Sequence, residues 1–229
     1  MKSVGVIGGL GPETTANFYL EVIFRCQQLN DKQRPSVVVG SVPLLFEIER
    51  DLIAHNSGIE RYIPFLQEEA KRLERSGVDF LVMPCNSLHV FIEEIRTAVA
   101  IPVLSIVEET ISYLNSKDIK KVGLISTSAT IENKVYESKL SESGIEYVTP
   151  VDEQRSKIDS IIQRLVSGEH LEEDRKFLID TANSISEKDV SYVALACTDL
   201  QLLNPESEKV EIFDTMKILA DSTVTLILS

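Results

Sequence analysis

The stretches "DFLVMPCNSL" (residues 79–88) and "SYVALACTDL" (residues 191–200) share one pattern, an apolar run that ends in a cysteine followed by short polar side chains. Each run is typical of a buried strand that leads into a helix. The two cysteines, Cys85 and Cys197, are 112 positions apart. A second similar pair, "VGVIGGLGPETTANFY" (4–19) and "VGLISTSATIENKVY" (122–136), is offset by 118. The nearly equal offsets predict two related halves, each built from βα units around a parallel sheet.

The predicted fold class is α/β, with two pseudo-symmetric parallel-sheet domains and a cleft between them. We place the first domain at residues 1–102, with a C-terminal helix of about 215–229 returning to it, and the second at 103–214. Short β-branched runs predict strands at 3–8, 36–42, 79–84, 101–106, 120–126, 145–150, 190–196 and 210–214. Helical spacing predicts helices near 12–29, 58–76, 87–98, 106–116, 129–142, 153–167, 171–185 and from 215. Gly77 and Gly144 stand where a helix-terminating left-handed residue is expected.

Composition and charge narrow the classes of partner. The chain has 229 residues, 43% of them hydrophobic, and a formal net charge of −13, which argues against nucleic-acid binding because phosphates need clustered Lys and Arg. The apolar stretches are too short for a signal peptide or a membrane span, so we expect a cytoplasmic protein with no membrane partner. The three cysteines have no metal-ligand spacing, and we expect free thiols and no metal.

The turn "GGLGPETT" (8–15) could suggest a dinucleotide-binding loop. The third glycine of that motif would stand at position 14, which is Thr14, and no acidic residue ends the second strand. A phosphate-binding lysine is also missing. We therefore expect no nucleotide cofactor, and a loop whose backbone comes close to a small anion at the start of a helix.

Cys85 and Cys197 each end a strand and begin a helix, at the edge where open α/β sheets bind ligands. A helix N-terminus is expected to lower the pKa of a thiol toward neutrality, so that it can give and take a proton. Two such thiols on either side of one substrate carbon could invert its configuration. Cys26, in the middle of a helix, is expected to be structural.

His89 offers a competing interpretation, because it lies four residues after Cys85 and could activate it as a nucleophile. That hypothesis predicts a Cys–His hydrolase of small amides. It leaves Cys197 and Thr198 without a function, and a capping or core role for His89 is at least as good an expectation.

The quoted motifs, in this order and spacing and over essentially the whole chain, resemble the cofactor-independent aspartate/glutamate racemase superfamily, most closely its aspartate racemase branch. The resemblance implies racemisation of aspartate by Cys85 and Cys197 without pyridoxal phosphate or metal, in a homodimer. It further implies substrate binding by the glycine loop and by the two cysteine turns. The implied binding residues are Gly9, Leu10, Gly11, Asn86, Ser87 and Thr198. Ser87, Ala196 and Asp199 replace the threonine, glycine and glutamate that are more frequent in the family, which bears on substrate preference.

An acidic substrate would need a cation for its distal carboxylate. The candidates are Arg50 and either Lys157 or Arg155, and a loop from Glu47 to Gly58, which contains Asn56, is expected to act as a lid. Glutamate or broad specificity and a maleate isomerase remain open within the fold. A non-catalytic sensor that keeps the two-domain cleft to bind a dicarboxylate remains open outside this class of enzyme.

Overall fold

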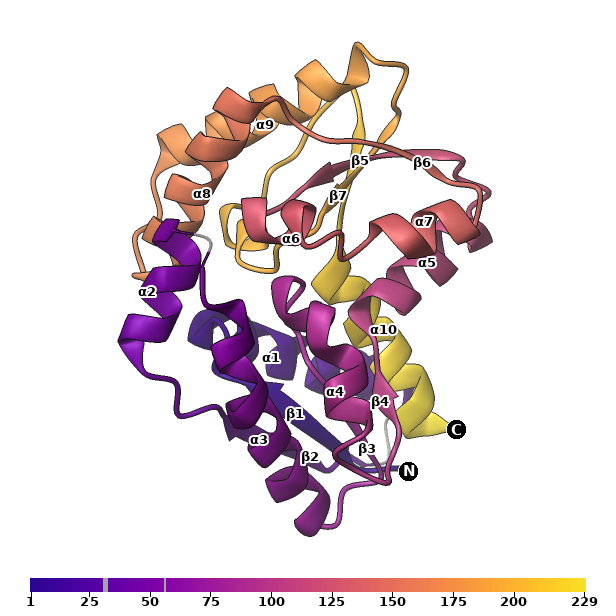
Figure 1. Cartoon of the computed structure of the whole chain (residues 1–229). Helices are drawn as coiled ribbons and strands as arrows, with labels where there is room; N and C mark the ends of the chain where they lie inside the picture. Colours follow the sequence, from indigo (N-terminus) through magenta and orange to yellow (C-terminus); the bar gives the residue numbers. More distant parts are fainter. Residues whose placement is uncertain (31–32, 56) are drawn as a thin grey trace.

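The computed structural model describes residues 1–30, 33–55 and 57–229 and shows an α/β fold with two four-stranded parallel sheets (Figure 1). The first sheet has the order β2-β1-β3-β4 and the second the order β6-β5-β7-β8. All eight predicted strands are present. Their bounds are β1 Val4–Gly8, β2 Val37–Ser41, β3 Phe80–Val82, β4 Val103–Leu104, β5 Lys121–Ile125, β6 Glu146–Val148, β7 Tyr192–Leu195 and β8 Glu211–Asp214.

The two sheets are built alike, which confirms the predicted pseudo-symmetry of the fold. In each sheet the first strand along the chain pairs in parallel with both the second and the third, as in Val4↔Val37 and Val4↔Phe80. In the second half Gly123 pairs in the same way with Val148 and Val193. The carboxyl ends of β3 and β7, which lead to Cys85 and Cys197, therefore occupy equivalent positions.

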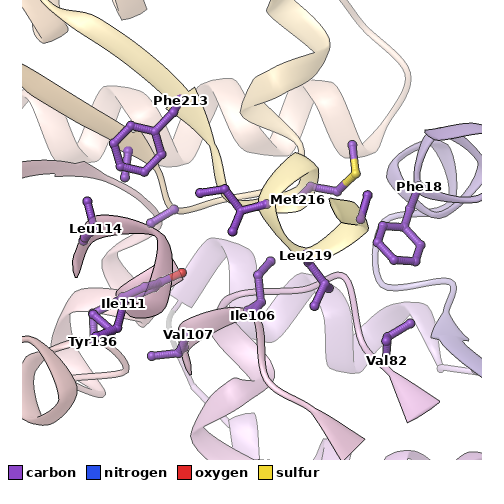
Figure 2. Packing of buried hydrophobic residues seen from close by; sticks show 14 of the residues in the cluster. Phe18, Val82, Ile106, Val107, Ile111, Leu114, Tyr136, Phe213, Met216 and Leu219 are labelled. Atoms are coloured by element: carbon purple, nitrogen blue, oxygen red, sulfur yellow. The ribbon is translucent and has the colours of Figure 1, made fainter. Parts of the chain in front are cut away.

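Side-chain alternation along the central strands divides the interior into three hydrophobic clusters. On β1, Val4 and Val6 belong to a central cluster shared by both halves, whereas Ile7 belongs to an outer cluster of the first half. On β7, Ala194 lies in the central cluster and Val193 in the outer cluster of the second half. Because strand side chains alternate, the inner strands β1, β3, β5 and β7 bury side chains on both faces and are largely apolar, whereas the edge strands β2 and β6 are partly exposed. Figure 2 shows the central cluster.

The helices cover these faces. Helices α1, α5, α7 and α10 contribute to the central cluster, α3 and α4 cover the outer face of the first sheet, and α8 and α9 that of the second. The α-helices are α1 Pro12–Leu29, α2 Phe46–His55, α3 Ile63–Arg75, α4 Ile92–Arg96, α5 Ile106–Ser116, α6 Ser128–Glu132, α7 Glu137–Glu142, α8 Asp152–Val166, α9 Glu172–Ser186 and α10 Thr215–Leu228, and the 3₁₀ helices are η1 Ile59–Tyr62, η2 Ser87–Phe91 and η3 Leu200–Leu203. Gly77 and Gly144 have φ values of 83° and 65°, as predicted for residues that end a helix.

Three helix predictions need correction. The segment predicted as a loop from Glu47 forms helix α2, because Ile48 and Leu52, four residues apart, are both buried against the first half. Asn56, named in the lid prediction, lies outside the described residues. The predicted helix 129–142 is interrupted between α6 and α7, where Lys134 has a φ of 54° and Tyr136 turns into the central cluster. The predicted helix 87–98 begins as the 3₁₀ helix η2.

The C-terminal helix α10 packs against α1 and α5, and its Ile227 carbonyl accepts a hydrogen bond from the Lys2 N–H at 2.9 Å. Its position beside the first half is visible in Figure 1. The division of the chain into domains at residue 102 stays a prediction, with one adjustment at its edge. Because β4 pairs with β3, the first sheet extends to Leu104.

Candidate active site

A cavity of about 70 Å³ lies at the carboxyl ends of the central strands of both sheets, and both predicted thiols line it. We call it the thiol cavity. Helix α2 of the first half and helix α8 of the second half contact each other beside it and contribute Leu52, Ile162 and Val166 to its wall (Figure 1). It is lined by Leu10, Gly11, Leu44, Glu49, Leu52, Tyr62, Cys85, Asn86, Ser87, Leu88, Thr127, Ile162, Val166, Cys197, Thr198 and Asp199.

The two cysteine turns have matching geometry. The backbone N–H groups of Ser87 and Leu88 donate to the Cys85 sulfur. In the same way, the backbone N–H groups of Asp199 and Leu200 donate to the Cys197 sulfur. The turns also contact each other, since the Thr198 hydroxyl donates to the Pro84 carbonyl at 3.3 Å. The sequence repeat thus places two equivalent thiols in one cavity, each with hydrogen bonds that stabilise its thiolate form.

Burial nevertheless dominates the acidity of both thiols, which corrects the prediction that their pKa lies near neutrality. Desolvation raises the pKa of Cys85 to about 12 and that of Cys197 well above its ordinary value, although the backbone N–H donors oppose the shift. The negative charge of Asp199 raises both further. Both thiols are therefore protonated at neutral pH in this structure.

His89 is buried behind the Cys85 turn and is fully hydrogen-bonded by the backbone. Its Nε2 accepts from the Ile106 N–H at 3.1 Å, so Nδ1 carries the proton and donates to the Cys85 carbonyl at 2.6 Å. Burial lowers the pKa of His89 to about 4. The imidazole is thus neutral and holds the backbone of the turn, which is not the arrangement of a base that activates the Cys85 sulfur.

Asn86 is almost fully buried, and its side chain connects the cysteine turn to the second half of the chain. Its Oδ1 accepts from the Tyr136 hydroxyl at 2.5 Å, and its Nδ2 donates to the Thr215 hydroxyl at 3.1 Å. Thr215 in turn donates to the Leu195 carbonyl at 2.9 Å. This network positions both turns, and substrate binding by the Asn86 amide stays a prediction.

Of the predicted glycine loop, Leu10 and Gly11 line the thiol cavity and Gly9 does not. Gly11 has a φ of 87°, and a Cβ atom there would lie 2.4 Å from Asp199 Oδ1. Asp199 also accepts from the Thr14 hydroxyl at 2.6 Å, while burial raises the pKa of its carboxyl to about 6. The first glycine loop therefore contacts the second cysteine turn.

The other predicted binding residues of the turns, Ser87 and Thr198, line the thiol cavity. The Ser87 hydroxyl lies 3.0 Å from both the Thr127 and the Thr130 hydroxyls, and these two are 2.9 Å apart. Such a triangle can direct hydroxyl donors at a carboxylate.

The predicted cations lie outside the thiol cavity. Arg50 is exposed and lines an outer groove with Phe46 and Arg164. Lys157 lies over the Phe177 ring, 4.3 Å from its centroid, and Arg155 forms an ion pair with Asp152. Among the cavity-lining residues that the structure describes, none is Lys, Arg or His.

Several cavity residues were not proposed from the sequence as site residues, namely Leu44, Glu49, Leu52, Tyr62, Leu88, Thr127, Ile162, Val166 and Asp199. Thr127 could have been found, because the 118-residue offset of the repeat aligns it with Gly9 of the glycine loop. The residues of α2 and α8 carried no such signal.

No cluster of three or more His, Cys, Asp or Glu that could hold a metal ion occurs in the described parts of the chain. Within the described parts of the chain, no helix is long and apolar enough to cross a membrane.

Comparison with known proteins identifies the family of the chain. The family model described as Asp/Glu/Hydantoin racemase matches residues 7–223. The chain belongs to this racemase family. It is 32% identical to the broad specificity amino-acid racemase RacX of Bacillus subtilis, over 99% of this chain and 98% of that protein. Glutamate racemase of Aquifex pyrophilus is 28% identical over 69% of this chain and 62% of its own. As a member of the family the protein is an isomerase that acts on a small molecule.

Solved structures of related racemases share the fold. The Picrophilus torridus aspartate racemase superposes with a TM-score of 0.81 at 24% identity, covering 99% of this chain and 94% of its own. An aspartate racemase homologue from Pyrococcus horikoshii gives a TM-score of 0.79 at 24% identity and full coverage of both chains. At these identities the likeness shows the two-sheet architecture alone.

Proposed function

We propose that the protein racemises a free amino acid by proton transfer between Cys85 and Cys197. The observation that carries the proposal is the pair of matched thiols lining one cavity, each with two backbone N–H donors on its sulfur. A cavity that presents two proton-transfer groups to one carbon suits removal and return of an α-proton.

The chemistry balances without an added reagent. The reaction requires that one thiol first loses its proton to solvent as the substrate binds. That cysteine, as thiolate, takes the α-proton and becomes a thiol, and the Cα–H electron pair is delocalised into the substrate carboxylate. The other cysteine, as thiol, then gives its proton to the opposite face and becomes the thiolate. The enantiomer leaves an enzyme in which the two sulfurs have exchanged roles, so both directions use the same groups.

The polar side chains supplied by the two cysteine turns differ in a way that would orient the substrate. The hydroxyls of Ser87 and Thr127 suit the α-carboxylate, and the Asp199 carboxylate suits the α-ammonium group. This arrangement leaves the α-carbon between the sulfurs. Cofactor independence, a homodimer and a cytoplasmic location stay predictions.

Aspartate, the substrate predicted from the sequence, is less well supported than an amino acid in general. The predicted partners of a distal carboxylate, Arg50 and Lys157, lie outside the thiol cavity. A relative of nearly equal length is named a broad specificity amino-acid racemase. We therefore propose an amino-acid racemase whose substrate does not need an acidic side chain.

The Cys–His hydrolase has less support, because both nitrogens of His89 are bonded to the backbone. A maleate isomerase would need cations for two carboxylates, and the described lining offers no basic side chain. A non-catalytic sensor would not require two thiols with matching donors.

The test compares Cys85→Ser with Cys197→Ser on a panel of L- and D-amino acids in deuterium oxide, followed by NMR and chiral chromatography. Racemisation should fall by several orders of magnitude in both variants, beyond the roughly 10²–10⁴-fold usual for one general base. Each variant should still exchange the α-proton of one enantiomer, and the two variants should favour opposite enantiomers.

Cys26→Ser is the matched control, because Cys26 is buried in the central cluster away from the thiol cavity. It should retain normal racemisation. Normal racemisation by Cys197→Ser, or exchange of the same enantiomer by both variants, would refute the two-base assignment.

A further inference from the structure

The charged side chains that line the thiol cavity are all acidic among the residues described. Glu49 on α2 and Asp199 after β7 line it, and no basic side chain does among the residues described. Burial raises the pKa of Glu49, and its negative charge in turn raises the pKa of Cys85, which places the carboxyl near the reacting sulfur. The thiolate of the reaction would add a third negative charge to this cavity.

Glu49 has no hydrogen-bond or ion-pair partner among the described residues, in contrast to its neighbours on the same helix. Glu47 and Asp51 are both paired with Arg61, at 2.8 Å and 2.9 Å. Asp199 has the Thr14 hydroxyl as a donor. Glu49 is half-buried and has no competing partner within the described parts of the chain, so its carboxylate is available to a cation in the thiol cavity.

The position of Glu49 suits the far end of a substrate side chain. It lines the thiol cavity and also the outer groove between α2 and α8, as Val166 does. The two basic residues of that groove, Arg50 and Arg164, do not line the thiol cavity, and Arg164 is paired with Asp174. Leu52 and Ile162 line the thiol cavity together with the two cysteines and Glu49, and their apolar side chains can cover methylene groups. A long aliphatic chain with a charged end would therefore have an apolar wall and a terminal carboxylate.

We propose that the preferred substrate is an amino acid with a positively charged side chain, such as lysine, ornithine or arginine, and that Glu49 is the residue that recognises it. The inference rests on the proposed racemase function and specifies its substrate class. The α-ammonium group of the substrate would bind to Asp199, and its side-chain cation would bind to Glu49. A cationic substrate supplies the positive charge that a thiolate requires and that no described lining residue provides. Aspartate would add a net negative charge to a cavity that already holds two carboxylates.

The test measures kcat/KM for racemisation of L-lysine, L-ornithine, L-methionine and L-aspartate by chiral chromatography. Lysine and ornithine should exceed methionine by at least tenfold, and aspartate should be the poorest substrate. Glu49→Gln keeps the shape of the side chain and removes its charge. A hydrogen bond to a charged group contributes about 1.5–3 kcal/mol, so the ratio of kcat/KM for lysine over methionine should fall by about 10–150-fold.

Glu47→Gln is the matched control, because Glu47 is on the same helix, is exposed and does not line the thiol cavity. It should leave the lysine-to-methionine ratio unchanged within twofold. Preference for aspartate in the wild type, or an unchanged ratio in Glu49→Gln, would overturn the substrate class while leaving the racemase intact. Absence of racemisation with every amino acid would instead refute the proposed function on which the inference rests.

Discussion

Replacing His89 by glutamine separates a histidine that holds the Cys85 turn from one that activates the thiol. The buried ring accepts from the Ile106 N–H and donates to the Cys85 carbonyl, and burial lowers its pKa to about 4. The variant should lose about 1–3 kcal/mol of unfolding free energy at neutral pH, because two buried backbone groups lose well-placed partners.

The pH dependence gives the sharper number. An unfolded chain binds a proton at this histidine near pH 6.5, whereas the folded protein does so near pH 4. Between these values the unfolded state binds more protons, so stability is lost as the pH falls from 6.5 to 4. A difference of about 2.5 pKa units corresponds to an upper limit of about 3 kcal/mol.

The assay is denaturant unfolding of the wild type, His89→Gln and His170→Gln between pH 7.5 and 4.5. The advantage of the wild type over His89→Gln should shrink by 2–3 kcal/mol as the pH falls, because glutamine does not titrate. His170 is exposed and lies 3.1 Å from Glu13, so its replacement should change the free energy by less than about 0.5 kcal/mol.

Two results would refute this account of His89. One is an advantage of the wild type that stays constant with pH. The other is a limb of the pH–rate profile that is present in the wild type and absent in His89→Gln, since such a limb would identify the imidazole as a proton-transfer group.

Three further substitutions test the surroundings of the site. Tyr136→Phe removes the hydroxyl that donates to the buried Asn86 Oδ1 at 2.5 Å, and it should lower the free energy of unfolding by about 1–3 kcal/mol in denaturant. A loss below about 0.5 kcal/mol would contradict the hydrogen-bond network around Asn86. Burial raises the pKa of Asp214 to about 7, so its contribution to stability is present below pH 4 and lost as the pH rises through 7. Asp214→Asn should therefore raise the free energy of unfolding, measured with denaturant, by on the order of 2 kcal/mol at pH 8, with no gain at pH 4. Gly11→Ala should lower kcat/KM at least tenfold because its Cβ would meet Asp199, whereas Gly77→Ala, with nothing within 4 Å, should cost only stability; equal activities would count against the close contact.

The sheets were predictable because a parallel strand covered on both faces is an uninterrupted apolar run. All five residues of β1 are buried, and its partner β3 is buried throughout. The repeat then supplied the topology, since equal spacing of two cysteine turns requires equivalent strands. These signals are local in sequence and do not depend on how the halves meet.

The acidity of the thiols was not predictable, because its sign depends on tertiary burial. The sequence shows that Cys85 begins a helical turn, and this indicates hydrogen-bond donors that lower the pKa. How much water the opposite half of the chain removes is not a property of that turn. Desolvation by both halves outweighs the donors and raises the pKa to about 12.

The choice between Arg50 and Glu49 was also beyond the sequence, because it depends on the rotation of a helix. Successive residues on a helix point about 100° apart, so the burial of Ile48 and Leu52 determines which neighbour faces the cavity. Glu49 lines the thiol cavity as well as the outer groove, whereas Arg50 lines the outer groove and not the thiol cavity. A segment taken for a loop has no such register, and either charge could then be placed at the substrate.

The repeat is most informative at a position where the charge of its two side chains differs. The offset of 112 that relates the two cysteines also relates Ser87 to Asp199. Each of these two residues contacts the other half of the chain in the segment that follows its first strand. Ser87 joins Thr127 and Thr130, whereas Asp199 joins Thr14 and lies against Gly11. Racemisation needs equivalent thiols on opposite faces of the carbon, but it also needs a substrate held in one orientation for both enantiomers. Equivalent sulfurs meet the first need. A hydroxyl on one side and a carboxylate on the other meet the second, because a carboxylate group and an ammonium group prefer different ends of the same cavity.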